Sequence, residues 1–335
     1  MSHKKASSDE EKGLRLLSML ERFNRGEVIH KRQETERYNV TEKTFYRDIN
    51  TLREHFEITY PDGFLTIKNS RKKGGYYLDR DKQGWLSQQE VMATAKVLLE
   101  SRAFPDAEIV GLLDKILLQC NPESRKHVSE VIRNERYHYQ ELNHGKPLMD
   151  LIWDLSWAIR ESRLVEILYR RVKADKDALR VIEPLGIMFS EFYFYLVANI
   201  YDSGYEYPAV YRLDRISKYK ILAERFKVQY AHRFEEGEFR KRIQFMKQGK
   251  LTKIQFKFRG ESLEAVLDRL PTARVIGYED GTALVEAEVF GKGIKMWLLS
   301  QAEFLTVTQP PDFVKEMKAT IAAMAANYCD QTLKG

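Results

Sequence analysis

The sequence predicts a multidomain α+β protein, and three changes of pattern along its 335 residues support that fold class. The first part shows helical periodicity and one short basic hairpin. The middle part switches at Leu164 to the two-residue alternation of strands, and the last part alternates strands with helices. Because domains usually hold about 100 to 200 residues, we expect several parts, at 1–80, 81–163, 164–235 and 250–335.

Three helices are expected in the first part. The first is a core-packing helix at 13–23, because its apolar residues share one helical stripe: Leu16, Leu17, Leu20 and Phe23. Gly26 can adopt the left-handed conformation that stops a helix. A second, weaker helix is expected from about Val28 to Tyr38, ending at Asn39, which tolerates a tight turn.

The third helix begins at Thr41, a natural N-cap, and has two distinct faces. Phe45, Ile49 and Leu52 recur at the spacing of a buried face. The opposite face carries side chains that can bond base edges or phosphate oxygens: Lys43, Tyr46, Arg47 and Asn50. This spacing suits a helix in a major groove, whereas an ordinary solvated face would have the same polarity.

Two short strands are expected next, at 64–68 and 76–79, with a basic connection between them. At the tip of this hairpin Arg71, Lys72 and Lys73 can contact phosphates, and each contact adds to affinity and to salt dependence. Three helices followed by a basic hairpin predict a winged helix-turn-helix.

The third helix resembles the recognition helix of DeoR-type winged helix-turn-helix domains. The resemblance lies in Val40-Thr-Glu-Lys-Thr-Phe-Tyr-Arg-Asp-Ile-Asn-Thr-Leu52, where a threonine and an Arg-Asp-hydrophobic step match the family pattern: Thr44, Arg47, Asp48 and Ile49. It implies that Thr44 and Arg47 contact DNA. Asp48 is either a bridge within the helix or a local buttress, and the sequence does not choose between them.

Residues 81–163 are rich in helix formers and predict a helical linker. Ser87-Gln-Gln-Glu90 is a capping box that opens a helix to about Ser101, and further helices are expected at 106–120, 122–137 and 147–162. Asn143–Pro147 is a turn-rich break that would suit a hinge. Four leucines would line a dimer interface or an internal core equally well: Leu98, Leu112, Leu113 and Leu117.

From Leu164 onward, short strands predict a small antiparallel β-barrel, a fold that often binds ligands across an exposed face. The expected strands are 165–170, 180–189, 192–200, 210–213 and 217–222.

This segment resembles the WYL domain, whose name-giving triplet stands here as Phe194-Tyr195-Leu196. Other landmarks are Tyr169 with Arg170, Arg180-Val-Ile-Glu-Pro184, and the most specific motif, Tyr211-Arg-Leu-Asp-Arg-Ile216. The resemblance implies an Sm-like barrel that binds a nucleotide or a nucleic-acid fragment. The positions that match its polar and basic ligand-binding residues are Tyr169, Arg180, Tyr195, Arg212 and Arg215.

Some of these residues have simpler explanations. Phe194 and Leu196 suit a barrel core, and Arg215 can pair with Asp214 or Glu183. Ala209 stands where many family members carry an arginine, which removes one phosphate contact, whereas Phe194 in place of tryptophan keeps the aromatic bulk.

The last part predicts a small α+β module, with elements at 254–258, 262–270, a hairpin turned by Glu279-Asp-Gly281, then 292–299, 304–307 and 312–328. Pro310-Pro311 ends the last strand and starts the final helix. The module resembles the carboxy-terminal extension of WYL domains in Trp297-Leu-Leu, Val307 and Pro311. That resemblance implies packing against a neighbouring subunit and a role in dimerisation or regulation.

Composition narrows the function classes. The net charge of +6 favours a polyanionic partner, and basic blocks at 1–80 and 151–250 alternate with mildly acidic ones. No apolar run approaches the roughly 20 residues of a membrane span, and the charged start lacks the apolar stretch of a secretion signal, so we expect a cytoplasmic protein without membrane contact. Cys120 and Cys329 lie far apart without ligand spacing, which favours reduced thiols over a disulfide or zinc site.

These patterns together predict a sequence-specific DNA-binding transcriptional regulator, a repressor rather than an activator. We expect a homodimer on a pseudopalindromic duplex operator, with a nucleotide or oligonucleotide effector and no cofactor. One alternative is a single-stranded nucleic-acid-binding accessory protein without operator specificity, for which Arg47 substitutions would leave binding intact. Another is an enzyme with an unrecognised site, although GxxxxGK[ST], GxSxG, HExxH and GxGxxG are absent from the sequence.

Overall fold

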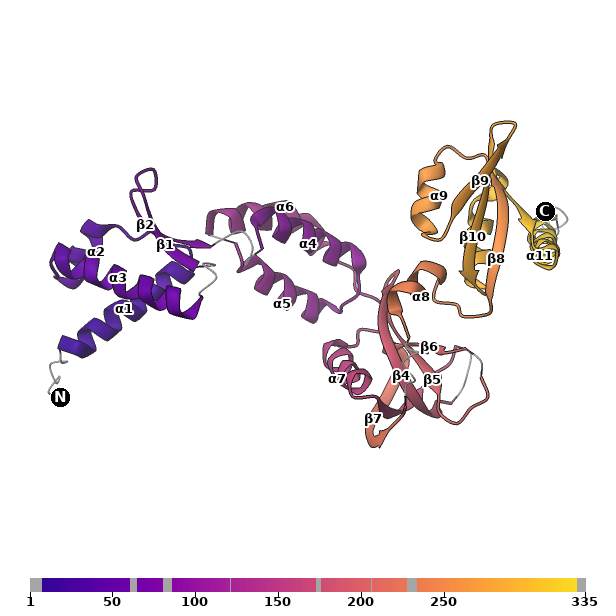
Figure 1. Ribbon diagram of the computed structural model, residues 1–335, viewed down its shortest axis with the longest axis horizontal. Coiled ribbons are helices and arrows are strands. Elements are labelled where there is room, and N and C mark those ends of the chain that lie inside the picture. The colour runs from indigo at the N-terminus through magenta and orange to yellow at the C-terminus, as the bar shows by residue number, and fades with distance from the viewer. Residues whose placement is uncertain are drawn as a thin grey trace, which may run out of the picture. The chain divides into compact units, whose positions relative to one another are not determined.

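The computed structural model describes residues 8–60, 65–80, 86–120, 122–172, 176–205, 207–227 and 234–329, which form two compact units, Met1–Gly145 and Lys146–Gly335 (Figure 1). The boundary falls inside the turn-rich stretch 143–147 that the sequence marks as a break. None of the described helices is both long enough and apolar enough to cross a membrane.

The head, residues 8–80, opens with three helices: α1 (Ser8–Asn24), α2 (Lys31–Tyr38) and α3 (Glu42–Thr59). The connection between α2 and α3 is short, because one residue caps the end of α2 and another caps the start of α3. Asn39 adopts the left-handed conformation, with φ of 48°, and closes α2. The Thr41 side chain accepts a hydrogen bond from the Thr44 backbone N–H and opens α3. Both boundaries confirm the prediction from these two residues.

An antiparallel hairpin of β1 (Leu65–Ser70) and β2 (Gly75–Arg80) follows the helices. The first residue expected in this hairpin, Phe64, lies outside the described residues. Ile29 and Tyr76 exchange two backbone hydrogen bonds, of 2.7 and 2.9 Å, which fasten the start of α2 to the hairpin. Gly75 permits this approach, because a Cβ there would lie 2.6 Å from the Ile29 carbonyl oxygen.

Two ion pairs, one buried and one partly buried, join the helices of the head around an apolar core that includes Phe23, Phe45 and Ile49. The Arg15 Nε atom lies 2.5 Å from the Asp48 carboxylate and links α1 to α3. Arg22 makes the same kind of contact with Glu34 of α2, also at 2.5 Å. Asp48 is therefore a buttress between helices, which decides between the two roles that the sequence leaves open.

The linker helices form a small core of their own: α4 (Gln88–Ser101), α5 (Asp106–Leu117) and α6 (Pro122–Tyr137). The Ser87–Glu90 capping box is present as predicted. Leu113 and Leu117 are buried in this core and Leu98 packs against it, so internal packing accounts for them. Helix α5 ends at Leu117, earlier than expected, and Arg125 donates hydrogen bonds to the Leu117 carbonyl at the helix end and to the Cys120 carbonyl that follows it.

The second unit begins with α7 (Met149–Arg160), which packs on an antiparallel sheet of five strands. The strands are β3 (Arg163–Tyr169), β4 (Ala178–Ser190), β5 (Tyr193–Ile200), β6 (Ala209–Arg212) and β7 (Ile216–Arg225), in the order β6-β5-β4-β3-β7. Helix α7 covers one face, and α8 (Glu236–Arg242) contributes Phe239 to a second cluster on the other.

This sheet corrects one prediction, because its described strands do not close into the small barrel expected from the sequence. Strands β6 and β7 are the two edges of an open sheet. The short strand β6 runs directly into the turn η1 (Leu213–Arg215), and β7 then pairs with β3 at the far edge. With only four residues, β6 offers little backbone for pairing beyond its contact with β5.

The last part is a four-stranded antiparallel sheet with helices, in the order β11-β8-β10-β9. Its elements are β8 (Leu251–Phe258), α9 (Leu263–Arg269), β9 (Arg274–Glu279), β10 (Thr282–Phe290), α10 (Gly293–Ser300), β11 (Leu305–Gln309) and α11 (Pro311–Cys329). Asp280 and Gly281 both adopt positive φ, as a tight hairpin turn requires, which confirms the predicted turn between β9 and β10. The core contains Phe256, Val285 and Trp297.

Replacing Asp48 with alanine should destabilise the head by about 3–5 kcal/mol, because it leaves the Arg15 guanidinium buried without its counter-charge. Hydrogen–deuterium exchange of peptides from α1 and α3 would measure the loss of protection. Glu36→Ala is the control, since the Arg32–Glu36 pair on α2 is exposed and should contribute less than about 1 kcal/mol. Equal losses of protection in the two variants would show that the Arg15–Asp48 pair does not hold α1 and α3 together.

Glu286 should make the last domain sensitive to acid. Hydrogen bonds from Gln255, Lys253 and Arg274 lower the pKa of Glu286 from 4.5 to about 2. A carboxylate whose pKa is lowered by folding stabilises the folded state above pH 4.5, and this contribution disappears as the pH falls toward 2. Glu286→Gln should therefore be less stable than the wild type in urea at neutral pH, and the difference should shrink between pH 4.5 and 2. The control is Glu264→Gln, at an exposed position on α9, whose stability should stay close to that of the wild type across this pH range.

Candidate nucleic-acid interface and ligand site

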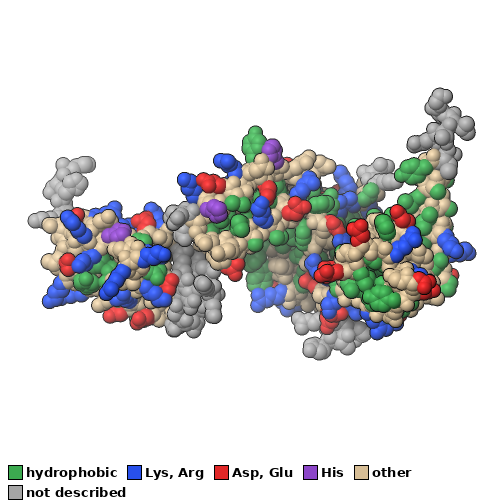
Figure 2. Space-filling view, turned by 90° about the horizontal axis from the view of Figure 1, so that it is seen from above, with side chains coloured by type: hydrophobic (Ala, Val, Ile, Leu, Met, Phe, Trp, Pro, Cys, Tyr) green, Lys and Arg blue, Asp and Glu red, His purple; other side chains and the backbone are tan. Residues whose placement is uncertain are grey.

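Helix α3 presents a polar outer face because its apolar residues are used in the head core. The side chains of Phe45, Ile49 and Leu52 are buried. Four residues on the opposite face are exposed, as the sequence predicts for a face that can meet DNA: Lys43, Tyr46, Arg47 and Asn50. Figure 2 shows Lys and Arg side chains, interspersed with Asp and Glu, on the visible surface of the head at the left of the view.

Two residues, Lys31 and Thr44, limit which side chains of this face are free to contact a ligand. Lys31 of α2 lies 5.7 Å from the centre of the Tyr46 ring and 3.0 Å from the Glu42 carboxylate, whose hydrogen bond raises the pKa of Lys31. Thr44 is half-buried, and its hydroxyl lies 3.0 Å from that of Thr41. Thr44 therefore belongs to the cap of α3, and its hydroxyl already has a local partner.

Arg53 also belongs to this face, although the sequence pattern alone did not single it out. Its Nη1 atom donates to the Asn50 side-chain oxygen at 3.3 Å, and its Nε atom donates to the Ile67 carbonyl of β1 at 3.0 Å. Arg53 thus ties the outer face of α3 to the hairpin. Its position three residues after Asn50, on the same side of a helix, was a signal that could have found it.

The hairpin tip holds the three predicted basic residues on an exposed turn. The Gly74 N–H donates to the Arg71 carbonyl, and the Lys73 ammonium lies 3.9 Å from the centre of the Tyr77 ring. Within the part of the chain that the structure describes, Arg71 and Lys72 make no side-chain hydrogen bond or ion pair. These two cations can therefore reach an external anion without breaking a contact.

A second candidate site lies where β5 pairs with β6. Arg212 makes two hydrogen bonds to the Asp214 carboxylate, of 2.9 and 2.7 Å, and its guanidinium carbon lies 3.3 Å from the centre of the Tyr193 ring. Tyr195 is the register partner of Arg212 across the two strands. Burial raises the pKa of Tyr195, and the nearby charges of Arg212 and Arg215 act in the opposite direction. The structure thus brings together three of the five predicted ligand residues.

The other two predicted residues lie beside Tyr211 rather than beside Tyr195. The Tyr169 ring packs edge-on against Tyr211, with ring centres 5.0 Å apart, and the Tyr169 hydroxyl accepts a hydrogen bond from the Arg212 backbone N–H. Burial raises the pKa of Tyr211, and the charge of Arg180 opposes that shift. Tyr169 is thus the link between the two groups, because it supports the backbone of Arg212.

The two pairings expected as alternatives for Arg215 do not occur among the described residues. Its expected partner Asp214 is engaged by Arg212, and Glu183 accepts a hydrogen bond from Asn199. Tyr193 and Asp214 complete the site, although the sequence motifs did not assign them to it. Tyr193 stands two residues before Tyr195, so strand alternation could have placed it on the same face.

The side chains of the Phe194-Tyr195-Leu196 triplet also alternate between the two faces of the sheet. Leu196 is fully buried and Phe194 is partly buried, both in the cluster beneath α7, which confirms their predicted core role. Tyr195 packs instead against the cluster that contains Phe239 of α8. No group of three His, Cys, Asp or Glu side chains suited to hold a metal ion occurs among the described residues.

Two segments of the second unit match known domain families. The WYL domain matches residues 150–221, and the WCX domain matches residues 250–325. The first match runs from α7 into β7, and the second runs from β8 into α11. Comparison with curated proteins finds no match.

Two solved structures are similar over nearly the whole chain. Proteasome accessory factor B/C (PafBC) of Arthrobacter aurescens is 15% identical, with 97% of this chain and 49% of that chain covered and a TM-score of 0.32. A CRISPR Cas-related protein is 13% identical, with coverages of 99% and 89% and a TM-score of 0.37. This chain spans about half the length of the first of these proteins.

Proposed function

We propose that this protein is a transcriptional regulator, in which the head binds duplex DNA and the WYL domain senses an anionic effector. The observation that carries the proposal is the division of α3 into a buried apolar face and an exposed face with Lys43, Arg47 and Asn50. A WYL domain and a WCX domain on the same chain agree with a head that reads DNA and a second unit that responds to a ligand.

In this proposal the head is a winged helix-turn-helix. Helices α2 and α3 form the helix-turn-helix, and α3 enters the major groove with Arg47 and Asn50 at the base edges. Arg71 and Lys72 on the hairpin tip contact phosphates and fix the orientation of the head. Arg53 would hold Asn50 in position through its contact with the hairpin.

We propose that the protein acts as a homodimeric repressor. Two copies would place their α3 helices in successive major grooves, about 34 Å apart, on a pseudopalindromic operator. The second half of α11 supports an association between copies, because Ile321, Met324 and Tyr328 are exposed there. Figure 2 shows hydrophobic side chains along this helix, at the right edge of the view. Apolar surface of this kind is common where a partner binds.

Effector binding is proposed at Tyr195, Arg212 and Arg215, with Tyr169 and Arg180 as supporting residues. Arginine binds phosphate with two parallel hydrogen bonds, and tyrosine rings provide surfaces on which bases stack. Asp214 occupies the Nε and Nη2 side of the Arg212 guanidinium, so a phosphate that binds on this side replaces that carboxylate. Such an exchange would release Asp214 from Arg212. Effector binding could then change the conformation of η1, which follows the edge strand β6.

A second candidate function is single-stranded nucleic-acid binding without operator specificity. It is favoured by an exposed aromatic surface on α7, where Trp153 and Trp157 have ring centres 6.1 Å apart. Arg160 lies 4.9 Å from the Trp157 ring. Exposed aromatic rings beside a cation can stack successive bases. This function would use the second unit rather than the head.

Arg47→Ala should reduce the preference for operator over random DNA by roughly 10-fold or more, because a base-reading contact is lost. Lys72→Ala should weaken binding to both duplexes alike and reduce the salt slope by about one phosphate contact. The measurement is competition binding on labelled duplex from upstream of the protein's own gene, at several salt concentrations. Arg133→Ala on the exposed side of α6 is the matched control. If Arg47→Ala and Lys72→Ala behave alike, the separation of base reading from phosphate binding is wrong.

Arg212→Gln should weaken the binding of a labelled single-stranded oligonucleotide by roughly 10-fold, because the bidentate phosphate contact is lost. Arg259→Gln on the WCX domain is the control, since this side chain donates to the Glu303 carbonyl, away from the proposed effector residues. Fluorescence anisotropy would report both affinities. Unchanged binding in Arg212→Gln would reject this effector site. Duplex binding fully lost to random competitor would favour the second candidate function.

A further inference from the structure

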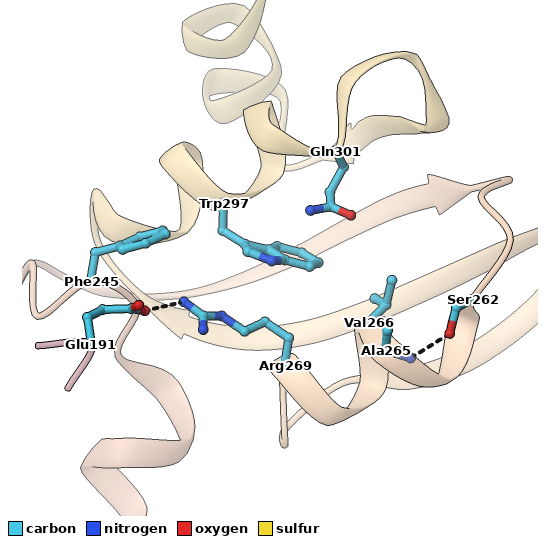
Figure 3. Close-up of a pocket in the computed structure, with 8 residues that line it drawn as sticks. All are labelled: Glu191, Phe245, Ser262, Ala265, Val266, Arg269, Trp297 and Gln301. Carbon is cyan, nitrogen blue, oxygen red and sulfur yellow. Dashed lines mark hydrogen bonds and ion pairs between the residues drawn. The ribbon is translucent and has the colours of Figure 1, made fainter. Parts of the chain in front are cut away.

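An open hollow of about 380 Å³ lies between the β4–β5 turn of the WYL domain and the helices α9 and α10 of the WCX domain. Figure 3 shows Trp297 and Phe245 on one side of the Arg269 side chain, with Glu191 meeting the guanidinium. Ser262 and Gln301 also line it. Its size is within the range of small-molecule sites, which are apolar with a few placed polar groups.

One of the two aromatic residues of the hollow, Phe245, lies in backbone of unusual conformation. Phe245 and Met246 both adopt φ of 50°, a left-handed conformation that side chains other than glycine seldom take. The backbone just before them packs closely on α10, because a Cβ on Gly293 would lie only 1.8 Å from the Gln244 carbonyl oxygen. The half-buried Phe245 ring lines the hollow and packs against the core cluster that contains Trp297. Strained backbone of this kind is found preferentially where ligands bind.

Arg269 has a donor that the protein does not use. Its Nη2 atom bonds the Glu191 carboxylate at 3.0 Å, and its guanidinium carbon lies 5.2 Å from the centre of the Phe245 ring. The Arg269 Nε–H is buried and has no hydrogen-bond partner among the described residues. A buried donor without an acceptor is unfavourable, so an oxygen atom supplied from outside would satisfy it.

We propose that this hollow binds a small planar aromatic carboxylate. The carboxylate takes the Nε and Nη2 donors of Arg269, which have the fork geometry of a bidentate contact, and the ring lies against Trp297 and Phe245. A single negative charge is favoured, because Arg269 is the one cation among the described lining residues and Glu191 stands beside it. A phosphate dianion would face repulsion from the same glutamate.

Binding there would exchange one carboxylate for another. Glu191 belongs to the turn between β4 and β5, whereas Arg269 ends α9, so their ion pair ties the WYL domain to the WCX domain. A ligand that takes over Arg269 releases this tie. The proposal concerns the second unit alone and does not depend on DNA binding by the head.

Isothermal titration of the full chain with 2-naphthoate, benzoate and their uncharged amides tests the proposal. At least one carboxylate should bind roughly 10-fold more tightly than its amide, and Arg269→Gln should remove that preference. Glu191→Gln should tighten carboxylate binding, because it removes the competing charge. Arg259→Gln, on the same domain but outside the hollow, should bind like the wild type.

Arg269→Lys tests the role of the bidentate guanidinium contact, because it keeps the positive charge but lacks the paired N–H donors. This variant should bind the carboxylate more weakly than the wild type but more tightly than Arg269→Gln. Circular dichroism melts establish that each variant is folded. The proposal is overturned if no carboxylate binds, if amides bind equally well, or if folded Arg269→Gln retains the preference. None of these readouts uses DNA, so they cannot be confused with failure of the regulator proposal.

Discussion

The five-stranded sheet in the segment that matches the WYL domain must bury both of its faces, and the arrangement of the second unit follows from that requirement. One face is covered by α7 with Leu151 and Leu155, and the other by α8 with Phe239. Strand alternation therefore divides neighbouring residues of β5 between two cores, so that Leu196 and Tyr195 serve different purposes. The chain leaving α8 reaches the WCX domain through Phe245, which packs against the core of that domain. The need to cover the second face thus positions both the Arg212 site and the hollow beside Arg269.

The head meets a similar requirement with charges as well as apolar contacts. Helix α3 can present a stable polar face to solvent only if its other face is held in place, and the Asp48 carboxylate does this by bonding Arg15 of α1. Replacing such a pair with apolar residues can leave stability unchanged, whereas removing one partner leaves a buried charge. The pair therefore defines how α3 sits on α1 more than it adds stability. The exposed cations on α3 and on the hairpin tip are then available for an external polyanion.

Arg212 and Arg269 have the same kinds of contact, although they lie in different parts of the second unit. Each guanidinium lies against an aromatic ring, Tyr193 in one case and Phe245 in the other, and each is engaged by one carboxylate. An incoming anion can replace either carboxylate, and the released group belongs to a turn at the end of a β-strand. Ligand binding would then change the contacts of that turn, and a site that works by exchange can couple binding to the surrounding structure. The two sites differ in their second arginine. Arg215 acts on Tyr195 in the Arg212 site, whereas Arg240, which lines the pocket next to Arg269, donates a hydrogen bond to the Phe189 carbonyl.

Local features of this protein were determined by the sequence itself. Asn39, Thr41 and the Ser87–Glu90 box set helix ends, because capping depends on residues within one turn of each other. The apolar character of Phe194 and Leu196 likewise assigned them to a core, because the preference for burial belongs to the side chain itself. Tertiary structure alone decided the partners that are distant in the sequence, such as Arg15 with Asp48 and Glu191 with Arg269, since many carboxylates could have met each arginine. It also decided that the described strands form an open sheet, because closure depends on which edges meet and not on the pattern within any strand.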